Sequence, residues 1–335
     1  MTPIFTAIGN ACIDLMAAVD DDFLIRNDIP KGLCRFVDDI ALLNMIKSGM
    51  GKYQPIPGGA GANVAHVMSA LGHESHFISK IGADAEGTAF HNHMEENGVT
   101  CHFPSTMPHR STSQILTLIT PDSERTFLSF DDVTKTSSAD DFDFDLLRAT
   151  DFLYLDGYCF VSPHTAQAFV KAGVAVRHRG GHVTFNIGDA EYYTTQKDNV
   201  TTVLDVCDSI ICNMAEARVL FGSQDPDTAA SLAQKMADRF LFGAITDGPN
   251  GATVFHNHSI AHVPAISVDP AAMADTNGAG DHFSAGFIYG LMNGYSLEQS
   301  GRLGILCATD CIGHTGARPL GGRGSLKHLA EYAGS

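Results

Sequence analysis

Between residues 150 and 250 the chain alternates short apolar segments with longer segments of helical spacing. DFLYLDG, HVTFNIG, DSIICN and FGAITDG have the length and composition of buried strands. The segments between them, SPHTAQAFVKAGVAVRHRGG, MAEARVLFG and DTAASLAQKMADRF, are typical of helices. Strands that alternate with helices form βαβ units and a mostly parallel sheet. Such sheets bind ligands at the carboxyl ends of their strands, so we expect functional residues there.

The first 130 residues are less regular. IFTAIGN predicts a strand, and GANVAHVMSALG and DAEGTAFHNHMEENG predict helices that a glycine ends. CIDLMAAVD, GLCRFVDD and TSQILTLITPDSERTFLSF predict strands with more polar alternation. We therefore expect one α/β domain over residues 1–335, with a small discontinuous β-sheet within roughly 12–50 and 99–130. Such a sheet could cover the strand ends as a lid.

Composition excludes several classes of partner. The net charge is −17, from 21 basic and 38 acidic residues, which disfavours nucleic acid and anionic membranes. No apolar run reaches the roughly 18–20 residues of a membrane span. The first residues lack a basic leader, and the eight cysteines form no CxxC pair. We expect a cytoplasmic protein with small-molecule partners.

The stretch DTNGAGDHFSAGF places Gly278, Ala279 and Gly280 directly before Asp281. Apolar residues then recur with helical spacing, so this loop lies at a helix N-terminus, where free N–H groups bind anions. The helix dipole favours an ionised Asp281 at neutral pH, ready to accept a proton from a hydroxyl. The alternative is that Asp281 only caps the helix.

A second glycine loop, PIPGGAGANVAHVMSALGH, also runs into a helix. It fails as a dinucleotide fingerprint because Val64 stands where a third small residue is needed, and no Lys-Ser/Thr follows as in a Walker A loop. A close backbone approach at Gly58 and Gly59 remains, with Asn63 suited to sugar hydroxyls. The alternative is a simple helix-entry turn.

Two further motifs follow predicted strands. In NMAEA, Asn213 and Glu216 share a helix face and could orient water on Mg²⁺, or cap the helix. AITDGPNGATVF places Thr246, Gly248 and Gly251 in or beside a turn. Each motif is weak when taken singly.

Taken together and in order, these motifs resemble the ribokinase-like (PfkB-type) family of carbohydrate and nucleoside kinases. DTNGAGD is similar to its C-terminal signature and GGAGANVAHVMSALG to its N-terminal one, while NMAE and TDGPNG match its NxxE motif and nucleotide loop. The resemblance runs from about residue 4 to residue 319. It implies a three-layer α/β/α core with a β-sheet lid and an ATP-dependent phosphotransferase.

The resemblance also implies a mechanism. Asp281 would accept the proton of a CH₂OH group as it attacks the γ-phosphate of ATP, while the Gly278, Ala279 and Gly280 amides neutralise the transferred charge. Asn213 and Glu216 would place Mg²⁺ through water. The ATP site would be bordered by Thr246, Gly248, Gly251, Thr276 and, in the loop GHTGARP, His314. Many relatives bind a monovalent cation such as K⁺ near that loop and Asp275, and for this chain the question is open.

Within the family, GNACIDLMAAVDDDFL is similar to the adenosine kinase branch and its bacterial relatives. That similarity implies that Asn10 and Asp14 line the acceptor pocket, with Asp14 accepting bonds from two hydroxyls. Gly58, Gly59 and Asn63 would line the sugar from the other side.

In DGYCF, Tyr158 or Phe160 could stack on adenine, although Phe160 could equally be a core residue. Arg125, in DSERTFLSF, could reach phosphate from the lid edge or be a surface charge. His282 follows the base where relatives have a small or apolar residue, and it could alter local protonation.

The phosphate acceptor stays open at this point. Adenosine is favoured, but RTFLSFDDV does not match an adenosine-specific lid, so ribose, fructose or another nucleoside remain alternatives. A non-catalytic binding module is disfavoured because Asp281 and an uninterrupted GAG loop are present. A dinucleotide-dependent oxidoreductase is disfavoured by the failed fingerprint. Both a monomer and a homodimer are compatible with the sequence.

Overall fold

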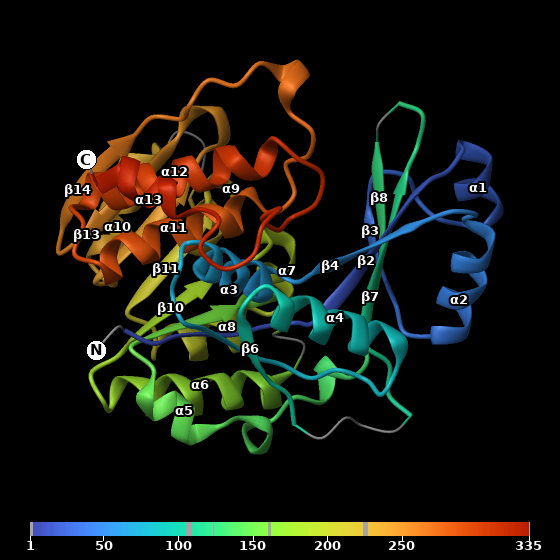
Figure 1. Ribbon diagram of the computed structural model, residues 1–335, viewed down its shortest axis with the longest axis horizontal. Helices are drawn as coiled ribbons and strands as arrows, with labels where there is room; N and C mark the ends of the chain where they lie inside the picture. Colours follow the sequence, from blue (N-terminus) through green and yellow to red (C-terminus); the bar gives the residue numbers. More distant parts are fainter. Residues whose placement is uncertain (1–2, 105–108, 123, 160–161, 224–226, 335) are drawn as a thin grey trace.

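The structure, a computed structural model, describes residues 3–104, 109–122, 124–159, 162–223 and 227–334. In this part of the chain the strands form a nine-stranded sheet and a five-stranded sheet (Figure 1). The large sheet has the order β14-β13-β12-β11-β10-β9-β1-β5-β6. Its strands are β1 (Phe5–Ile8), β5 (Ser75–Ile78), β6 (Val99–His102), β9 (Phe152–Asp156), β10 (His182–Asn186), β11 (Ser209–Asn213), β12 (Phe242–Thr246), β13 (Ala252–His256) and β14 (Ser259–Val263).

In this sheet the neighbouring strands β6, β5, β1, β9, β10, β11 and β12 are parallel, and the β13–β14 hairpin adds two antiparallel strands at one edge. The central strands are buried along most of their length, as expected when helices cover both faces. One face carries α3 (Ala60–Ala70), α4 (Ala85–Glu96), α11 (Ala279–Met292), α12 (Leu297–Ile312) and α13 (Lys327–Gly334). The other carries α5 (Phe144–Ala149), α6 (Pro163–Arg177), α7 (Ala190–Thr195), α8 (Lys197–Leu204), α9 (Met214–Phe221) and α10 (Ala229–Ala237).

Several helix starts follow directly from local sequence. Ser296 and Gln299 form a reciprocal capping box at the start of α12, and Ser162 caps α6 with Pro163 in its first turn. Short 3₁₀ turns cover Thr134–Thr136, Ala139–Asp141, Gly157–Cys159, Gly248–Asn250 and Pro270–Ala272. In the described residues, no helix combines the length and apolar character required to cross a membrane.

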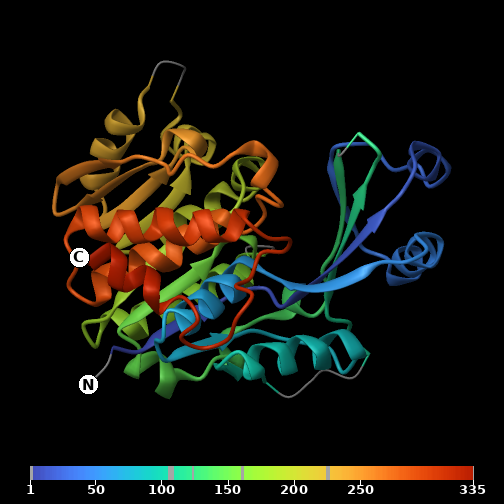
Figure 2. The ribbon, with the colours of Figure 1, turned by 45° about the horizontal axis from the view of Figure 1, so that its top comes forward.

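The five-stranded sheet, which we call the lid, stands to the side of the main body (Figures 1 and 2). It has the order β3-β8-β7-β2-β4. α1 (Asp21–Arg26) and α2 (Ile40–Gly49) cover its outer face. The chain crosses between the main body and the lid four times: after β1, after β4, after β6 and after β8. The lid strands are β2 (Cys12–Ala18), β3 (Cys34–Val37), β4 (Gln54–Gly58), β7 (Ser113–Ile119) and β8 (Arg125–Phe130).

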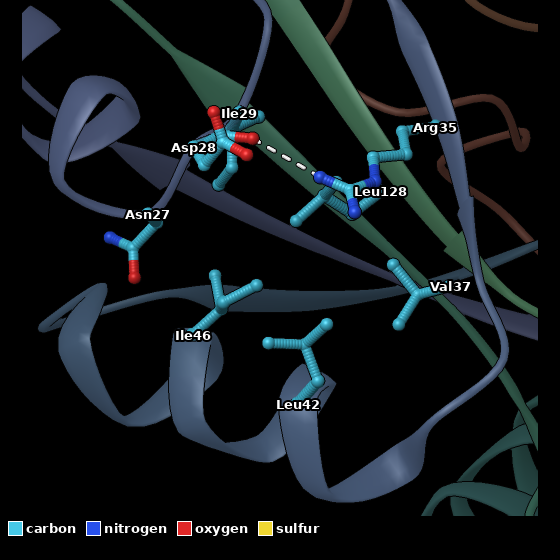
Figure 3. A pocket seen from close by; sticks show the side chains of 8 residues that line it. All are labelled: Asn27, Asp28, Ile29, Arg35, Val37, Leu42, Ile46 and Leu128. Atoms are coloured by element: carbon cyan, nitrogen blue, oxygen red, sulfur yellow. Dashed lines mark hydrogen bonds between the residues drawn. The ribbon is translucent and has the colours of Figure 1, made fainter.

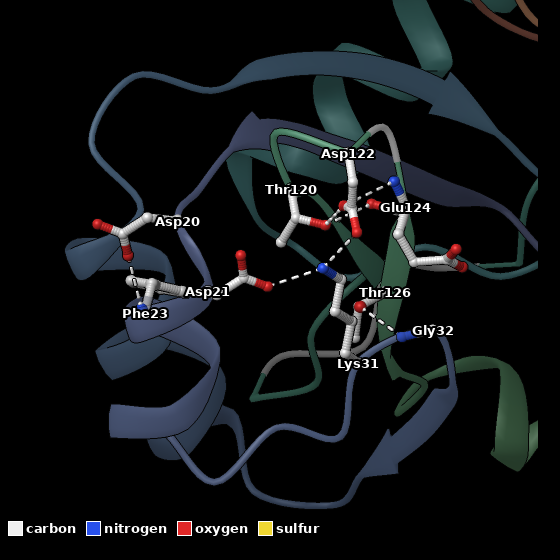
Figure 4. Close-up of polar contacts among 9 residues, drawn as sticks. All are labelled: Asp20, Asp21, Phe23, Lys31, Gly32, Thr120, Asp122, Glu124 and Thr126. Atoms are coloured by element: carbon white, nitrogen blue, oxygen red, sulfur yellow. Dashed lines mark hydrogen bonds and ion pairs between the residues drawn. The ribbon is translucent and has the colours of Figure 1, made fainter.

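Two features of the lid lie apart from the predicted site residues. A small cavity of about 220 Å³ lies between α2 and the sheet, and on the side away from α2 Arg35 donates to the Asp28 carbonyl (Figure 3). Near the β7–β8 turn, Lys31 Nζ lies 2.7 Å from carboxylate oxygens of both Asp21 and Asp122 (Figure 4). These contacts hold the lid together internally.

The predicted three-layer α/β core and separate β-sheet are confirmed, but the bounds of the lid differ from those expected. Its strands fall within 12–58 and 113–130, and residues 99–102, expected in the lid, pair with β5 in the main sheet. Gln54–Gly58, which the sequence did not indicate as a strand, contains Pro55 and Pro57. Proline is tolerated there because β4 is an edge strand that pairs with β2 alone.

Candidate active site

Two helix N-termini meet at the carboxyl edge of the parallel strands. Helix α3 carries Asn63 and helix α11 carries Asp281, and the two helices pack against each other. Asn63 Nδ2 donates a hydrogen bond to Asp281 Oδ2 at 2.8 Å. The structure therefore brings the two predicted glycine loops, 218 residues apart, to one place.

The loop before α11 has the geometry of an anion cradle. Gly278 is the cap residue with φ +79°, and a Cβ there would lie 2.5 Å from the Ala317 Cβ. The first N–H groups of a helix have no intrahelical partner and can bind an anion. A Cβ at Gly280 would meet open space. Asp281 lies inside the first turn and is not the cap, so the simple capping alternative does not describe it.

The carboxyl of Asp281 is tuned by its surroundings. Burial raises its pKa to about 7, the Asn63 hydrogen bond opposes that shift, and the nearby carboxylates Asp156 and Glu216 add to it. The carboxyl expected to be ionised is therefore only partly ionised at neutral pH, because burial opposes its charged form. A pKa near the working pH is what a general base requires.

A cavity of about 550 Å³ adjoins this loop and brings together most of the predicted nucleotide residues. Thr246, Gly248 and Gly251 line it from the β12–β13 turn. Apolar side chains including Ile266, Met273 and Ile305 complete it, which suits a planar ring. Thr276, Ala279 and Gly280 line the same cavity from the start of α11.

His314 is not among the residues that line this cavity. Neither of its ring nitrogens has a hydrogen-bond partner in the described part of the chain. Its predicted place in the nucleotide site thus has no supporting contact.

On the lid side, Asp14 is placed by the pairing of β2 with β4. A Cβ at Gly58 would lie 2.7 Å from Asp14 Oδ2, and one at Gly59, where φ is +96°, would lie 2.0 Å from the Asn10 carbonyl oxygen. Asp14 Oδ1 is buried and accepts no hydrogen bond from any described residue, and burial raises the Asp14 pKa to about 7. An unpartnered carboxylate oxygen at this point can accept bonds from ligand hydroxyls.

Asp156, at the end of β9, accepts hydrogen bonds from three separate backbone amides around the site, a role that the sequence did not predict. Its Oδ2 accepts from the Gly61 amide at 3.0 Å and the Asn10 amide at 3.5 Å, and its Oδ1 accepts from the Tyr158 amide at 3.0 Å. Burial raises its pKa. Asn10 itself accepts a bond from Thr134 Oγ1 at 2.8 Å. An aspartate that ends a buried strand is the sequence signal that could have identified it.

Arg318, in the segment after α12, was also missed. Its side chain is 5% exposed and lies against Asn63, Gly58 and Met94, with its guanidinium 5.0 Å from the centre of the Phe90 ring. Burial lowers its pKa to about 10. A lone arginine in a glycine-rich segment was the only local signal.

An ion pair joins the lid to the loop before α11. Arg125 Nη1 lies 2.8 Å from Asp275 Oδ1, which also accepts from the Asn277 amide at 2.9 Å. Asp275 Oδ2 accepts from the Gly316 amide at 3.2 Å. Arg125 is thus not a free surface charge, and its contact with phosphate stays a prediction. Asp275, which the sequence left as a possible ligand of a monovalent cation, faces a guanidinium.

Asn213 and Glu216 form a capping box at the start of α9, which is one of the two predicted alternatives. Asn213 donates to both Glu216 oxygens, at 2.7 and 3.0 Å. Burial raises the Glu216 pKa to about 7. In the described residues, no three His, Cys, Asp or Glu side chains are grouped to hold a metal. Mg²⁺ needs only one or two carboxylates when substrate phosphates supply the other ligands.

The aromatic prediction is only partly addressed. Tyr158 is 43% exposed, and its hydroxyl donates to the Gly188 carbonyl at 2.7 Å. Phe160 lies outside the described residues.

His282 is fully buried with Nε2 3.3 Å from the Ala317 carbonyl, and burial lowers its pKa to about 4. It is therefore neutral near pH 7, and its effect on the protonation of neighbouring groups stays a prediction.

Comparison with known proteins agrees with this geometry. The pfkB family carbohydrate kinase domain matches residues 40–320. A protein of Archaeoglobus fulgidus named "Uncharacterized sugar kinase" is 28% identical over 251 residues, covering 75% of this chain and 96% of the relative.

Two solved structures are similar over nearly the whole chain. The adenosine kinase from Sinorhizobium meliloti superposes with a TM-score of 0.88 at 25% identity and covers 99% of this chain and 100% of its own. An Escherichia coli protein described as "a putative Ribokinase II in complex with ATP and Mg+2" superposes with a TM-score of 0.76 at 21% identity, over 95% of this chain and 94% of its own.

Proposed function

Because the chain belongs to the pfkB family of carbohydrate kinases, we propose that it transfers the γ-phosphate of ATP to a primary hydroxyl of a nucleoside or sugar. The observation that carries the proposal is the 2.8 Å contact between Asn63 and Asp281. It places a carboxylate with a pKa of about 7 at the mouth of the anion cradle, beside the 550 Å³ cavity. Phosphoryl transfer needs little more than positioning and charge stabilisation, which this arrangement supplies.

The positions of these groups support the following reaction. ATP occupies the cavity beside Thr246 and Gly251 with its γ-phosphate toward the Gly278–Gly280 amides. The acceptor lies between Asp14 and Asn63, and its CH₂OH group loses a proton to Asp281 as the oxygen attacks phosphorus. Mg²⁺ would be held through water by Asn213 and Glu216 and would offset phosphate charge.

Adenosine is the acceptor that we propose. The likeness to the Sinorhizobium meliloti adenosine kinase extends over 99% of this chain, and the half-exposed ring of Tyr158 offers a surface for a base. A sugar is the second candidate, because the Archaeoglobus fulgidus relative is named a sugar kinase and the Tyr158 hydroxyl is already bonded to Gly188. No disulfide joins the cysteines in the described residues, in keeping with the cytoplasmic location that we propose.

The test is ADP release from Mg-ATP with adenosine, inosine, guanosine, ribose or fructose, each with and without K⁺. Asp281→Asn should abolish turnover, whereas Asp198→Asn, which removes an exposed carboxylate from the first turn of α8, should leave it unchanged. Turnover with adenosine alone supports the nucleoside assignment. Turnover with free sugars alone removes the role of Tyr158 as a base platform. Activity that survives intact in Asp281→Asn would show that another group is the base.

A further inference from the structure

Arg318 is a buried cation that does not line the nucleotide cavity, and it contacts two residues of the glycine loop that leads into α3. Its Nε donates to Asn63 Oδ1 at 3.1 Å, and its Nη2 donates to the Gly58 carbonyl at 2.8 Å. Its Nη1 lies 3.1 Å from the sulfur of Met94, and its Cζ lies 5.0 Å from the centre of the Phe90 ring. The planar fork of a guanidinium fixes the geometry of such contacts in a way that an ammonium group cannot.

The contact with Asn63 determines which end of that amide faces Asp281. An asparagine side chain has one oxygen that accepts and one NH₂ group that donates. Because Arg318 donates to the oxygen, the NH₂ group is turned toward Asp281, where it donates at 2.8 Å. Without Arg318, the amide could rotate and present its oxygen to the carboxylate, which repels it.

The contact with Gly58 ties the same guanidinium to the acceptor side. Gly58 lies against Asp14, since a Cβ on Gly58 would be 2.7 Å from Asp14 Oδ2. Arg318 thus links the strand that borders Asp14 to the amide that faces Asp281.

We propose that Arg318 is a positioning residue for phosphoryl transfer: it fixes Asn63 so that its NH₂ group holds Asp281 ready to accept a proton, and it anchors the Gly58 strand beside the acceptor. The kinetic part of this inference rests on the proposed function, whereas the effect on Asp281 protonation does not.

The charges around Asp281 support this assignment. In the described residues, the titratable groups that interact electrostatically with Asp281 are Tyr154, Asp156, Tyr158, Glu216, Cys311 and Arg318. Arg318 is the one cation in this set, so its loss leaves the Asp281 carboxylate among other acids and raises its affinity for a proton. His66 and His93 lie near Arg318, but burial lowers their pKa values to about 3 and 4, so neither replaces the missing charge.

The experiment compares Arg318→Met, Arg318→Lys and a matched control. Arg302→Met removes an exposed arginine whose guanidinium lies 4.6 Å from the centre of the Tyr332 ring, and it should behave as wild type. Arg318→Met should lower kcat by about 100-fold and move the acidic limb of the kcat profile upward by about one pH unit. KM for ATP should change less than about twofold, because Arg318 does not line the nucleotide cavity.

Arg318→Lys keeps the charge without the fork, so it should restore the position of the acidic limb but not kcat. Its expected stability is closer to wild type, so it carries the test if Arg318→Met does not fold. An acidic limb that stays in place in folded Arg318→Met would overturn the proposal. So would a loss of activity that matches only the loss of folded protein.

A second readout needs no turnover. The carboxyl ¹³C signal of Asp281, assigned by its disappearance in Asp281→Asn, should titrate about one pH unit higher in Arg318→Met than in wild type. If no substrate on the panel reacts, the proposed function fails while this titration still decides the role of Arg318. Identical titration in the two proteins would refute that role even if the kinase activity is present.

Discussion

Gly278→Ala and Gly280→Ala add the same methyl group two residues apart in the anion loop, yet the structure predicts opposite effects on stability. Gly278 has φ +79°, a conformation that costs an L-residue roughly 1–2 kcal/mol. The added methyl would lie 2.5 Å from Ala317 Cβ and 2.8 Å from Ala317 Cα, and such overpacking costs about 1–3 kcal/mol. The sum, roughly 2–5 kcal/mol, is a large share of the stability of an ordinary domain.

At Gly280 the same methyl would meet no protein atom within 4 Å. Gly280 lies in the first turn of α11, where alanine is preferred over glycine by up to about 1 kcal/mol. The variant should therefore be as stable as wild type or slightly more stable. Because Gly280 lines the nucleotide cavity, the methyl would push a phosphate away from the amides and lower kcat/KM for ATP by about 100-fold or more.

The assay is urea unfolding followed by circular dichroism, beside ADP release under saturating acceptor. The expected pattern is a folded, inactive Gly280→Ala and a strongly destabilised Gly278→Ala. Wild-type kcat/KM in Gly280→Ala would mean that no phosphoryl group approaches this position. An unchanged urea midpoint in Gly278→Ala would mean that the close approach to Ala317 does not shape the loop.

Three other perturbations test separate parts of the site. The free energy of unfolding of Asp281→Asn relative to wild type, measured in urea, should rise by roughly 1–3 kcal/mol from pH 4 to pH 8. The folded carboxyl, with a pKa of about 7, resists ionisation while the unfolded one ionises near pH 4, so wild-type stability falls as pH rises through that window. A difference that does not change with pH would contradict the burial argument. Glu216→Gln should raise the Mg²⁺ concentration for half-maximal activity several-fold. The control is Ser296→Ala, which breaks the capping box of α12 and should only reduce stability by about 1 kcal/mol. Equal Mg²⁺ titrations in the two variants would mean that Glu216 only caps helix α9. Arg125→Ala should raise KM for the acceptor by about tenfold because it frees the lid from Asp275. Its Tm should change little, since partly exposed ion pairs contribute up to about 1 kcal/mol. The control is Lys31→Ala, which breaks ion pairs within the lid, and an equal rise in KM in that variant would refute the specific role of Arg125.

The parts of the site that could be predicted are those encoded in short segments. The loop before α11, the start of α3 and the turn after β12 each show their conformation in consecutive residues, because glycine placement and helical spacing are local signals. The alternating strands and helices indicated the main sheet for the same reason.

The residues that were missed act through long-range contacts. Arg318 is 255 residues from Asn63, and Asp156 is 95 residues from Gly61, so no spacing rule connects them. Strand β4 was hidden by its two prolines, whose tolerance depends on an edge position that only the assembled sheet defines. The sequence indicated the helix dipole, which favours an ionised Asp281. It did not indicate the burial that raises the pKa of this carboxyl, because burial cannot be deduced from neighbouring residues.

The four crossings between the main body and the lid have a mechanical consequence. Asn10 and Gly59 lie on two of these crossings and approach each other closely, while Gly58 packs against Asp14, so the acceptor site that we propose lies at the base of the lid, the fulcrum of any rotation of this sheet. A small rotation at the fulcrum displaces the end of the lid much more than it displaces Asp14. Because the chain has no tryptophan, Phe36→Trp, at a side chain that is 55% exposed on the lid, would give a single tryptophan whose selectively excited fluorescence reports this movement.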